Sequence, residues 1–261
     1  MPEALFEFFE RIALELSGAE SKVLTHEDFR VNKENSPLLD DLMKSLKAPN
    51  TEDVIRCAVE KLKEHFDAKG ANLPFCYESA TGMFTAKDSE FLSFVNEMKD
   101  MRSIGKRSRD FECRVAKRLA LRATGTVHRV GHPRYRKKKT KQFNRYLRKL
   151  GFDQPVLLGR EKDGGLDILW MLPVGTIPHR PIVSVQCKNG EFNMDEADKS
   201  VAAGKRSFGQ NHRLQASVHV PCVLFNDYLY PQIITQKALE FVPLGLTDLA
   251  ALDKGINLDL I

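Results

Sequence analysis

Carboxylate, amide and lysine side chains stand at the ends of two short apolar segments. Asp167 directly precedes the segment 168–172, and Gln186 and Lys188 end the segment that begins at Ile182. Oxygen ligands of this kind bind Mg²⁺, which lowers the pKa of a bound water and neutralises charge on a phosphate. A lysine beside them can orient the water or stabilise the transition state. We therefore expect hydrolysis of phosphodiester bonds, with Mg²⁺ as the cofactor and Mn²⁺ as a substitute.

An antiparallel hairpin of these two segments would bring the three side chains together. If the chain turns back within 173–181, Asp167 lies opposite Cys187 and beside Gln186 and Lys188. Side chains alternate between the faces of a strand, so Gln186 and Lys188 share one face and Cys187 points to the other. The spacing thus predicts a site at one end of the hairpin.

These motifs resemble the PD-(D/E)XK nuclease superfamily and, within it, the Mrr-like restriction endonucleases, which carry Gln in place of the second acid. The resemblance rests on Asp163-Gly-Gly-Leu-Asp167 and Gln186-Cys-Lys188, preceded by Phe111-Glu112 and a later Gly125. It covers roughly residues 107–255. It implies a catalytic set of Glu112, Asp167, Gln186 and Lys188, with the metal held by Asp167, Gln186 and Glu112.

Positive charge is concentrated in the middle of the chain. Residues 102–149 hold 18 Lys and Arg against 2 Asp and Glu, whereas 1–101 hold 12 against 20 and 150–261 hold 10 against 13. Such a segment is typical of a polyanion-binding surface, although it could also be a solvated surface. We expect it to bind the DNA backbone through Arg129, Arg134, Arg136, Lys137, Lys138, Lys139 and Lys141.

Three histidines lie in basic or polar surroundings and could contact phosphate or transfer protons. They are His128, His132 and His212. A solvated or structural histidine is the more common case, so we leave them outside the expected site.

The amino-terminal region is expected to be helical. Apolar residues recur at helical spacing over 5–16, 39–46, 54–66 and 91–98, while Pro74 and Gly82 indicate a loop over 71–84. This region, residues 1–101, has no counterpart in the nuclease family.

The rest of the chain changes from helix to strand. The pattern of Phe111, Val115 and Leu119 predicts a helix that Gly125 closes, followed by a basic insertion at about 126–149 that we expect to be an exposed loop. Strands are expected at 156–158, 168–172, 182–185 and 218–225, with a helix from Asp195 to Phe208. This order predicts an α/β, restriction-endonuclease-like domain over 102–261, with a mixed central sheet flanked by helices.

Composition limits the class of protein further. The chain has 261 residues, 42% of them hydrophobic and 29% charged, and no apolar run long enough for a membrane span. Its five cysteines include no CxxC pair, so we expect reduced, buried thiols rather than disulfides or a zinc site. We expect a soluble, intracellular, cytoplasmic protein.

The expected function is site-specific restriction cleavage of double-stranded DNA by a homodimer, since a two-fold protein matches a palindromic site. One alternative is a structure-specific or repair nuclease of the junction-resolvase type, which would cleave branched DNA regardless of sequence. The other is a non-catalytic nucleic-acid-binding protein. A requirement for Mg²⁺ separates both nucleases from the binding protein.

Overall fold

A computed structural model of the chain describes most of the amino-terminal half and the central elements of the remainder. The described residues are 2–19, 23–103, 108–123, 125–129, 167–173, 181–190, 193, 195, 199, 219–228 and 242–252. The chain divides into two compact units, Met1–Ile104 with Tyr230–Ile233 and Gly105–Leu229 with Ile234–Ile261. Within the described ranges, no helix is both long and apolar enough to cross a membrane.

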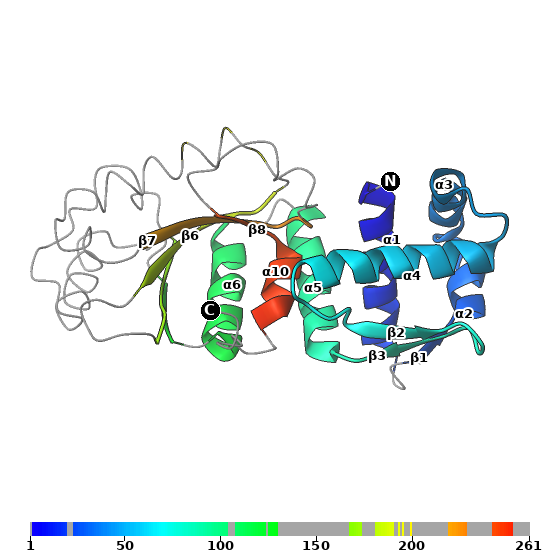
Figure 1. Ribbon diagram of the computed structural model, residues 1–261, viewed down its shortest axis with the longest axis horizontal. Helices are drawn as coiled ribbons and strands as arrows, with labels where there is room; N and C mark the ends of the chain where they lie inside the picture. Colours follow the sequence, from blue (N-terminus) through cyan, green and yellow to red (C-terminus); the bar gives the residue numbers. More distant parts are fainter. Residues whose placement is uncertain are drawn as a thin grey trace, which may run out of the picture. The chain divides into compact units, whose positions relative to one another are not determined.

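The first unit combines helices with a small antiparallel sheet of order β1-β3-β2 (Figure 1). The helices include the four that the apolar stripes predict. The elements are α1 (Pro2–Gly18), β1 (Val23–Thr25), α2 (His26–Val31), α3 (Ser36–Leu46), α4 (Thr51–Ala68), β2 (Phe75–Glu78), β3 (Met83–Ala86) and α5 (Ser89–Ser103).

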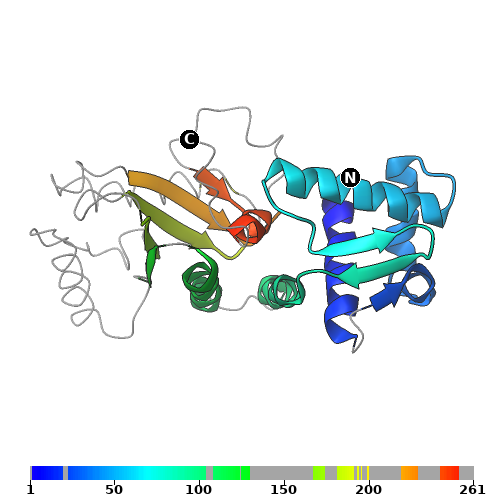
Figure 2. The ribbon, with the colours of Figure 1, turned by 60° about the horizontal axis from the view of Figure 1, so that its bottom comes forward.

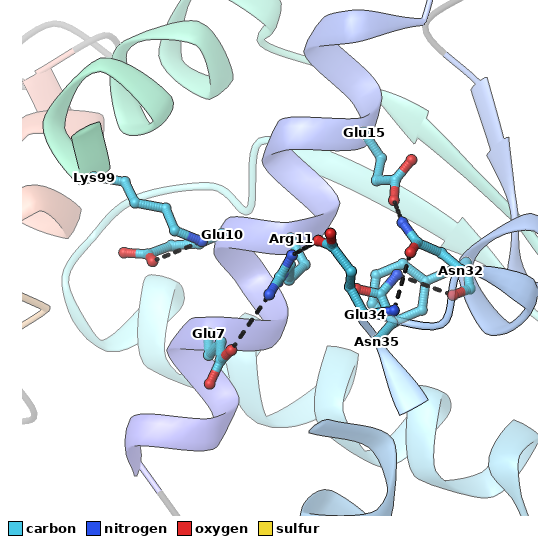
Figure 3. Close-up of polar contacts among 9 residues, drawn as sticks. Glu7, Glu10, Arg11, Glu15, Asn32, Glu34, Asn35 and Lys99 are labelled. Atoms are coloured by element: carbon cyan, nitrogen blue, oxygen red, sulfur yellow. Dashed lines mark hydrogen bonds and ion pairs between the residues drawn. The ribbon is translucent and has the colours of Figure 1, made fainter. Parts of the chain in front are cut away.

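Aromatic side chains fill the core of this unit. Phe8, Phe9 and Phe29 are fully buried, as are Phe66 and Phe84. Polar contacts around α1 tie it to its neighbours: Arg11 lies 2.8 Å from Glu34, and Glu10 lies 3.6 Å from Lys99 (Figure 3). Glu10 also contacts Arg102 of α5. The side-chain amide of Asn32 donates to Glu15 at 2.8 Å, and that of the buried Asn35 donates to the Phe29 carbonyl at 2.9 Å.

The loop expected over 71–84 is instead largely a β-hairpin, so residues 1–101 are not purely helical. Phe75 pairs with Ala86, and Glu78 pairs with Met83. Pro74 and Gly82, which suggested a loop, lie outside the strands: Pro74 precedes β2, and Gly82 adopts a φ of 64° in the turn between β2 and β3. Burial of Phe75 and Phe84 on one face stabilises strands that are too short to show clear alternation.

The second unit is built on a five-stranded mixed sheet of order β4-β5-β6-β7-β8. The pairs β4–β5 and β5–β6 are antiparallel, whereas β6–β7 and β7–β8 are parallel. Helix α6 packs against β4 and β6 (Figure 2). The elements are α6 (Ser108–Arg122), β4 (Thr126–Arg129), β5 (Ile168–Met171), β6 (Ile182–Lys188), β7 (His219–Phe225), β8 (Val242–Leu244) and α10 (Leu246–Ala251). The α/β class with a mixed sheet is therefore confirmed.

Helix α6 and the sheet share an apolar core. Phe111, Val115 and Leu119, the stripe that predicted the helix, are buried. So are Ile168 on β5 and Val185 on β6, which face each other across the hairpin. Burial of this stripe sets the rotation of α6 and, with it, the place of Glu112.

The beginning of the expected basic loop is a strand. Thr126–Arg129 pairs with β5, so that Thr126 lies opposite Met171 and Arg129 opposite Ile168. Gly125 precedes this strand at a φ of 103°, in a position where a Cβ atom would lie 2.0 Å from the Met171 carbonyl oxygen. The expectation of an exposed loop from residue 126 is therefore wrong for its first four residues.

Two expected elements, the strand at 156–158 and most of the helix from Asp195 to Phe208, lie outside the described residues. All five cysteines are free thiols, as expected, but only Cys187 and Cys222 are buried. Cys76 is exposed, and Cys57 and Cys113 are half-buried.

Candidate active site

The hairpin of β5 and β6 brings Asp167, Gln186 and Lys188 to one edge of the sheet. Ile168 lies opposite Val185, and the Asp167 amide donates to the Val185 carbonyl at 3.2 Å. The hairpin is antiparallel, as expected, but its register differs by one residue, which places Asp167 beside Gln186 rather than opposite Cys187. Because β6 runs parallel to β7, this edge also holds the carboxyl end of β7.

Asp167 is held rigidly at this edge. It is 1% exposed, and its Oδ2 accepts hydrogen bonds from the Gln186 side-chain amide and the Cys187 backbone amide, each at 2.7 Å. A carboxylate offers about four lone-pair positions, so these two bonds leave it further capacity as a ligand.

Gln186 and Lys188 differ in burial from Cys187 between them, as expected for side chains that alternate between the faces of a strand. Gln186 and Lys188 are half-buried, whereas Cys187 is buried. Since the Gln186 amide nitrogen donates to Asp167, its oxygen Oε1 points elsewhere, and within the described residues it accepts no hydrogen bond. Gln186 thus contributes a buried, neutral oxygen next to a carboxylate.

Helix α6 places Glu112 in the same neighbourhood. Glu112 is 4% exposed, and its Oε2 lies 3.6 Å from Nη2 of Arg129 at the end of β4. The pKa of the Cys187 thiol is raised well above its usual value, first by burial and then by the charges of Asp167 and Glu112, while Arg129 opposes this shift. Both carboxylates and the guanidinium therefore lie close enough to Cys187 to act on it.

The donor set fits a hard divalent cation. Asp167 and Gln186 would supply a carboxylate and an amide oxygen, which suit Mg²⁺. Glu112 would supply a second carboxylate, although Arg129 already neutralises part of its charge. Among the described residues, no group of three or more His, Cys, Asp or Glu side chains is placed to hold a metal ion.

Sequence reasoning missed Asn226, which follows β7 at the same edge. Asn226 is fully buried; its backbone amide donates to the Lys188 carbonyl at 2.9 Å, and its side-chain amide donates to Asn189 at 2.8 Å. These bonds fix the end of β6 and hence the backbone that carries Lys188. The signal available in the sequence was an asparagine directly after a buried strand, where parallel strands present their functional ends.

The expected DNA-binding residues are only partly covered. Arg129 lies on β4 with 26% of its side chain exposed, so it is not part of an exposed loop. Beside it on the strand, His128 is half-buried. The remaining basic candidates and two histidines lie outside the described residues: Arg134, Arg136, Lys137, Lys138, Lys139, Lys141, His132 and His212.

Comparison of the chain with protein-family models, with curated proteins and with solved structures finds no match.

Proposed function

We propose that this chain is a Mg²⁺-dependent DNA endonuclease with a restriction-endonuclease-like fold, related to the Mrr-like branch of the PD-(D/E)XK nucleases. The observation that carries the proposal is the convergence of Asp167, Gln186 and Lys188 on one sheet edge, with Gln186 donating to Asp167. These residues come from two strands and are separated by a linker, so their meeting is a property of the fold. The charge of residues 102–149 supports a nucleic acid as the substrate.

Each residue of the set has a distinct role in this proposal. Asp167, Gln186 and Glu112 hold the cation, which when bound supplies an activated water and neutralises phosphate charge. Lys188 lies two residues beyond Gln186 on β6 and hence on the same face of the strand, from which it would orient the attacking water or stabilise the pentavalent transition state. Asn226 keeps Lys188 in position through the backbone of β6.

The substrate is proposed to be double-stranded DNA, cleaved at a short sequence by a homodimer, because a two-fold protein matches a palindromic site. A structure-specific nuclease with the same core would instead cut branched DNA whatever its sequence. A protein that binds nucleic acid without catalysis would leave both substrates intact.

The proposal is tested by incubating the protein with plasmid DNA and with a four-way junction, in Mg²⁺ or in EDTA. We expect Mg²⁺-dependent cuts in the plasmid whose mapped ends share a short sequence. Cuts confined to the junction would replace the restriction assignment with a structure-specific one. Intact DNA under all conditions, from a protein that still binds it, would contradict the nuclease assignment.

A further inference from the structure

Arg129 ends β4 at the edge that carries the candidate active site. It lies opposite Ile168, the neighbour of Asp167, and its Nη2 is 3.6 Å from Oε2 of Glu112. The Glu112 side chain is only 5% exposed, whereas 26% of the Arg129 side chain is exposed. A buried carboxylate thus pairs with a partly exposed arginine, whose Nε and Nη2 atoms are themselves buried, at the strand end that carries Asp167.

The guanidinium retains unused capacity to donate hydrogen bonds. At 3.6 Å the contact with Glu112 is an ion pair but too long for a hydrogen bond. In the described part of the chain, neither Nε nor Nη2 of Arg129 has a hydrogen-bond acceptor. A guanidinium has five N–H donors in a planar fork that matches the oxygens of a phosphate.

We propose that Arg129 binds the phosphate that the site cleaves, and that Glu112 holds the guanidinium in place until DNA arrives. This inference rests on the proposed function. It assigns Arg129 to the candidate active site rather than to a general backbone-binding loop, because pairing of β4 with β5 fixes Arg129 opposite Ile168, the residue that follows Asp167. Glu112 and the phosphate then compete for the guanidinium of Arg129.

That competition predicts a coupling that a structural ion pair would lack. Replacing Glu112 with Gln should tighten metal-free DNA binding, because Arg129 then loses the carboxylate with which it forms an ion pair. Replacing Arg129 with Gln should weaken binding by about tenfold, as expected for loss of one charge-assisted contact to an anion. In the double variant, the gain from Glu112→Gln should disappear.

The experiment measures the anisotropy of a short labelled duplex in EDTA with wild type, Glu112→Gln, Arg129→Gln and the double variant. Asp167→Asn, alone and with Arg129→Gln, reports the general effect of removing a nearby negative charge. Lys117→Gln removes a positive charge from an exposed position of α6 and should change the dissociation constant much less than Arg129→Gln. Arg129→Lys keeps the positive charge but lacks the planar array of donors of a guanidinium, so it should bind DNA with intermediate affinity. This variant provides the test if Arg129→Gln does not fold.

An equal gain from Glu112→Gln with and without Arg129 would overturn the inference. So would an Arg129→Gln variant that melts at a lower temperature but binds DNA like wild type, since that result indicates a structural ion pair. Because these assays contain no metal, their failure alongside Mg²⁺-dependent cleavage by wild type would remove only the role of Arg129. Absence of that cleavage would remove the proposed function itself.

Discussion

At the scale of single residues, the amide of Gln186 explains how two proposed metal ligands, Gln186 and Asp167, can lie in direct contact. Its nitrogen donates to Asp167 Oδ2 at 2.7 Å, so the two side chains attract each other. A carboxylate in the same place would face another carboxylate across the same distance. A nearby cation would then be needed to hold the two together.

Gln186→Glu should therefore make the stability of the second unit depend on divalent metal. In EDTA we expect a loss of about 1–3 kcal/mol, because a hydrogen bond becomes a repulsive contact at a buried group. Added Mg²⁺ should raise the melting temperature of this variant by more than it raises that of wild type, since tighter binding to the native state stabilises it more. Fluorescence of Trp170, the single tryptophan, follows the unfolding of β5. Equal shifts with Mg²⁺ in both proteins would argue against a metal site here.

The sequence predicts the position of a candidate site residue when the strands that bring it to the site are neighbours in the sequence or carry a recognisable motif. Asp167, Gln186 and Lys188 were predictable because a hairpin needs only a turn between two apolar segments. The pairing of Arg129 with Glu112 was not, because it depends on a helix and a strand whose register the sequence pattern does not reveal. Asn226 depends in the same way on the parallel pairing of β6 with β7.

At the scale of elements, the join between α6 and β4 positions both Glu112 and Arg129. Gly125 makes this join possible because its backbone has a φ of 103° and its α-carbon approaches the Met171 carbonyl closely. Any side chain at this position would push β4 away from β5. The sequence marked Gly125 only as the end of a helix, and did not show that a strand begins directly after it.

Gly125→Ala should destabilise the second unit by about 1–3 kcal/mol or more, because it adds a positive-φ penalty to a contact of 2.0 Å with backbone. Chemical denaturation followed by Trp170 fluorescence measures the change. Gly18→Ala is the matched control: nothing lies within 4 Å of its added Cβ, and the position is the helical end of α1. A Gly125→Ala variant as stable as wild type would show that β4 is not held in the register described.

At the scale of the whole molecule, the first unit should respond to acid through His65. This residue of α4 is 4% exposed and packs edge-on against Phe6 at 4.9 Å, and burial lowers its pKa to about 4. The unfolded chain takes up a proton near the ordinary value of 6.5, whereas the folded chain resists it down to about 4. Stability from this group is therefore present at neutral pH and is lost as the pH falls through that window.

His65→Leu should lose less stability than wild type between about pH 7 and about pH 5, by at most about 1.4 kcal/mol per pH unit. Thermal melts followed by far-ultraviolet circular dichroism at both pH values measure the difference. The carboxylates are common to both proteins and cancel in the comparison. Parallel losses in the two proteins would exclude His65 as the source of acid sensitivity.

The distribution of charge along the chain predicts how the molecule binds DNA in salt. Replacing Lys137, Lys138 and Lys139 together with Ala should lower the magnitude of the slope of log K against log[salt] by up to about 3, since each phosphate contact contributes about 0.9. Sequence preference should change little, because backbone contacts do not read bases. Replacing the exposed Lys33, Lys44 and Lys63 of the acidic first unit should leave the slope nearly unchanged. An unchanged slope in the first triple variant would place that segment away from DNA.

The most direct test of the central claim compares wild type with Lys188→Ala on a duplex that wild type cuts in Mg²⁺. Lys188 is half-buried at the end of β6, so its loss should leave the fold and DNA affinity in place. Loss of a group that stabilises a transition state costs about 10²–10³ in rate. We predict a fall of at least that size in the single-turnover cleavage rate, with a dissociation constant close to that of wild type. Cleavage by Lys188→Ala at the wild-type rate would contradict the account.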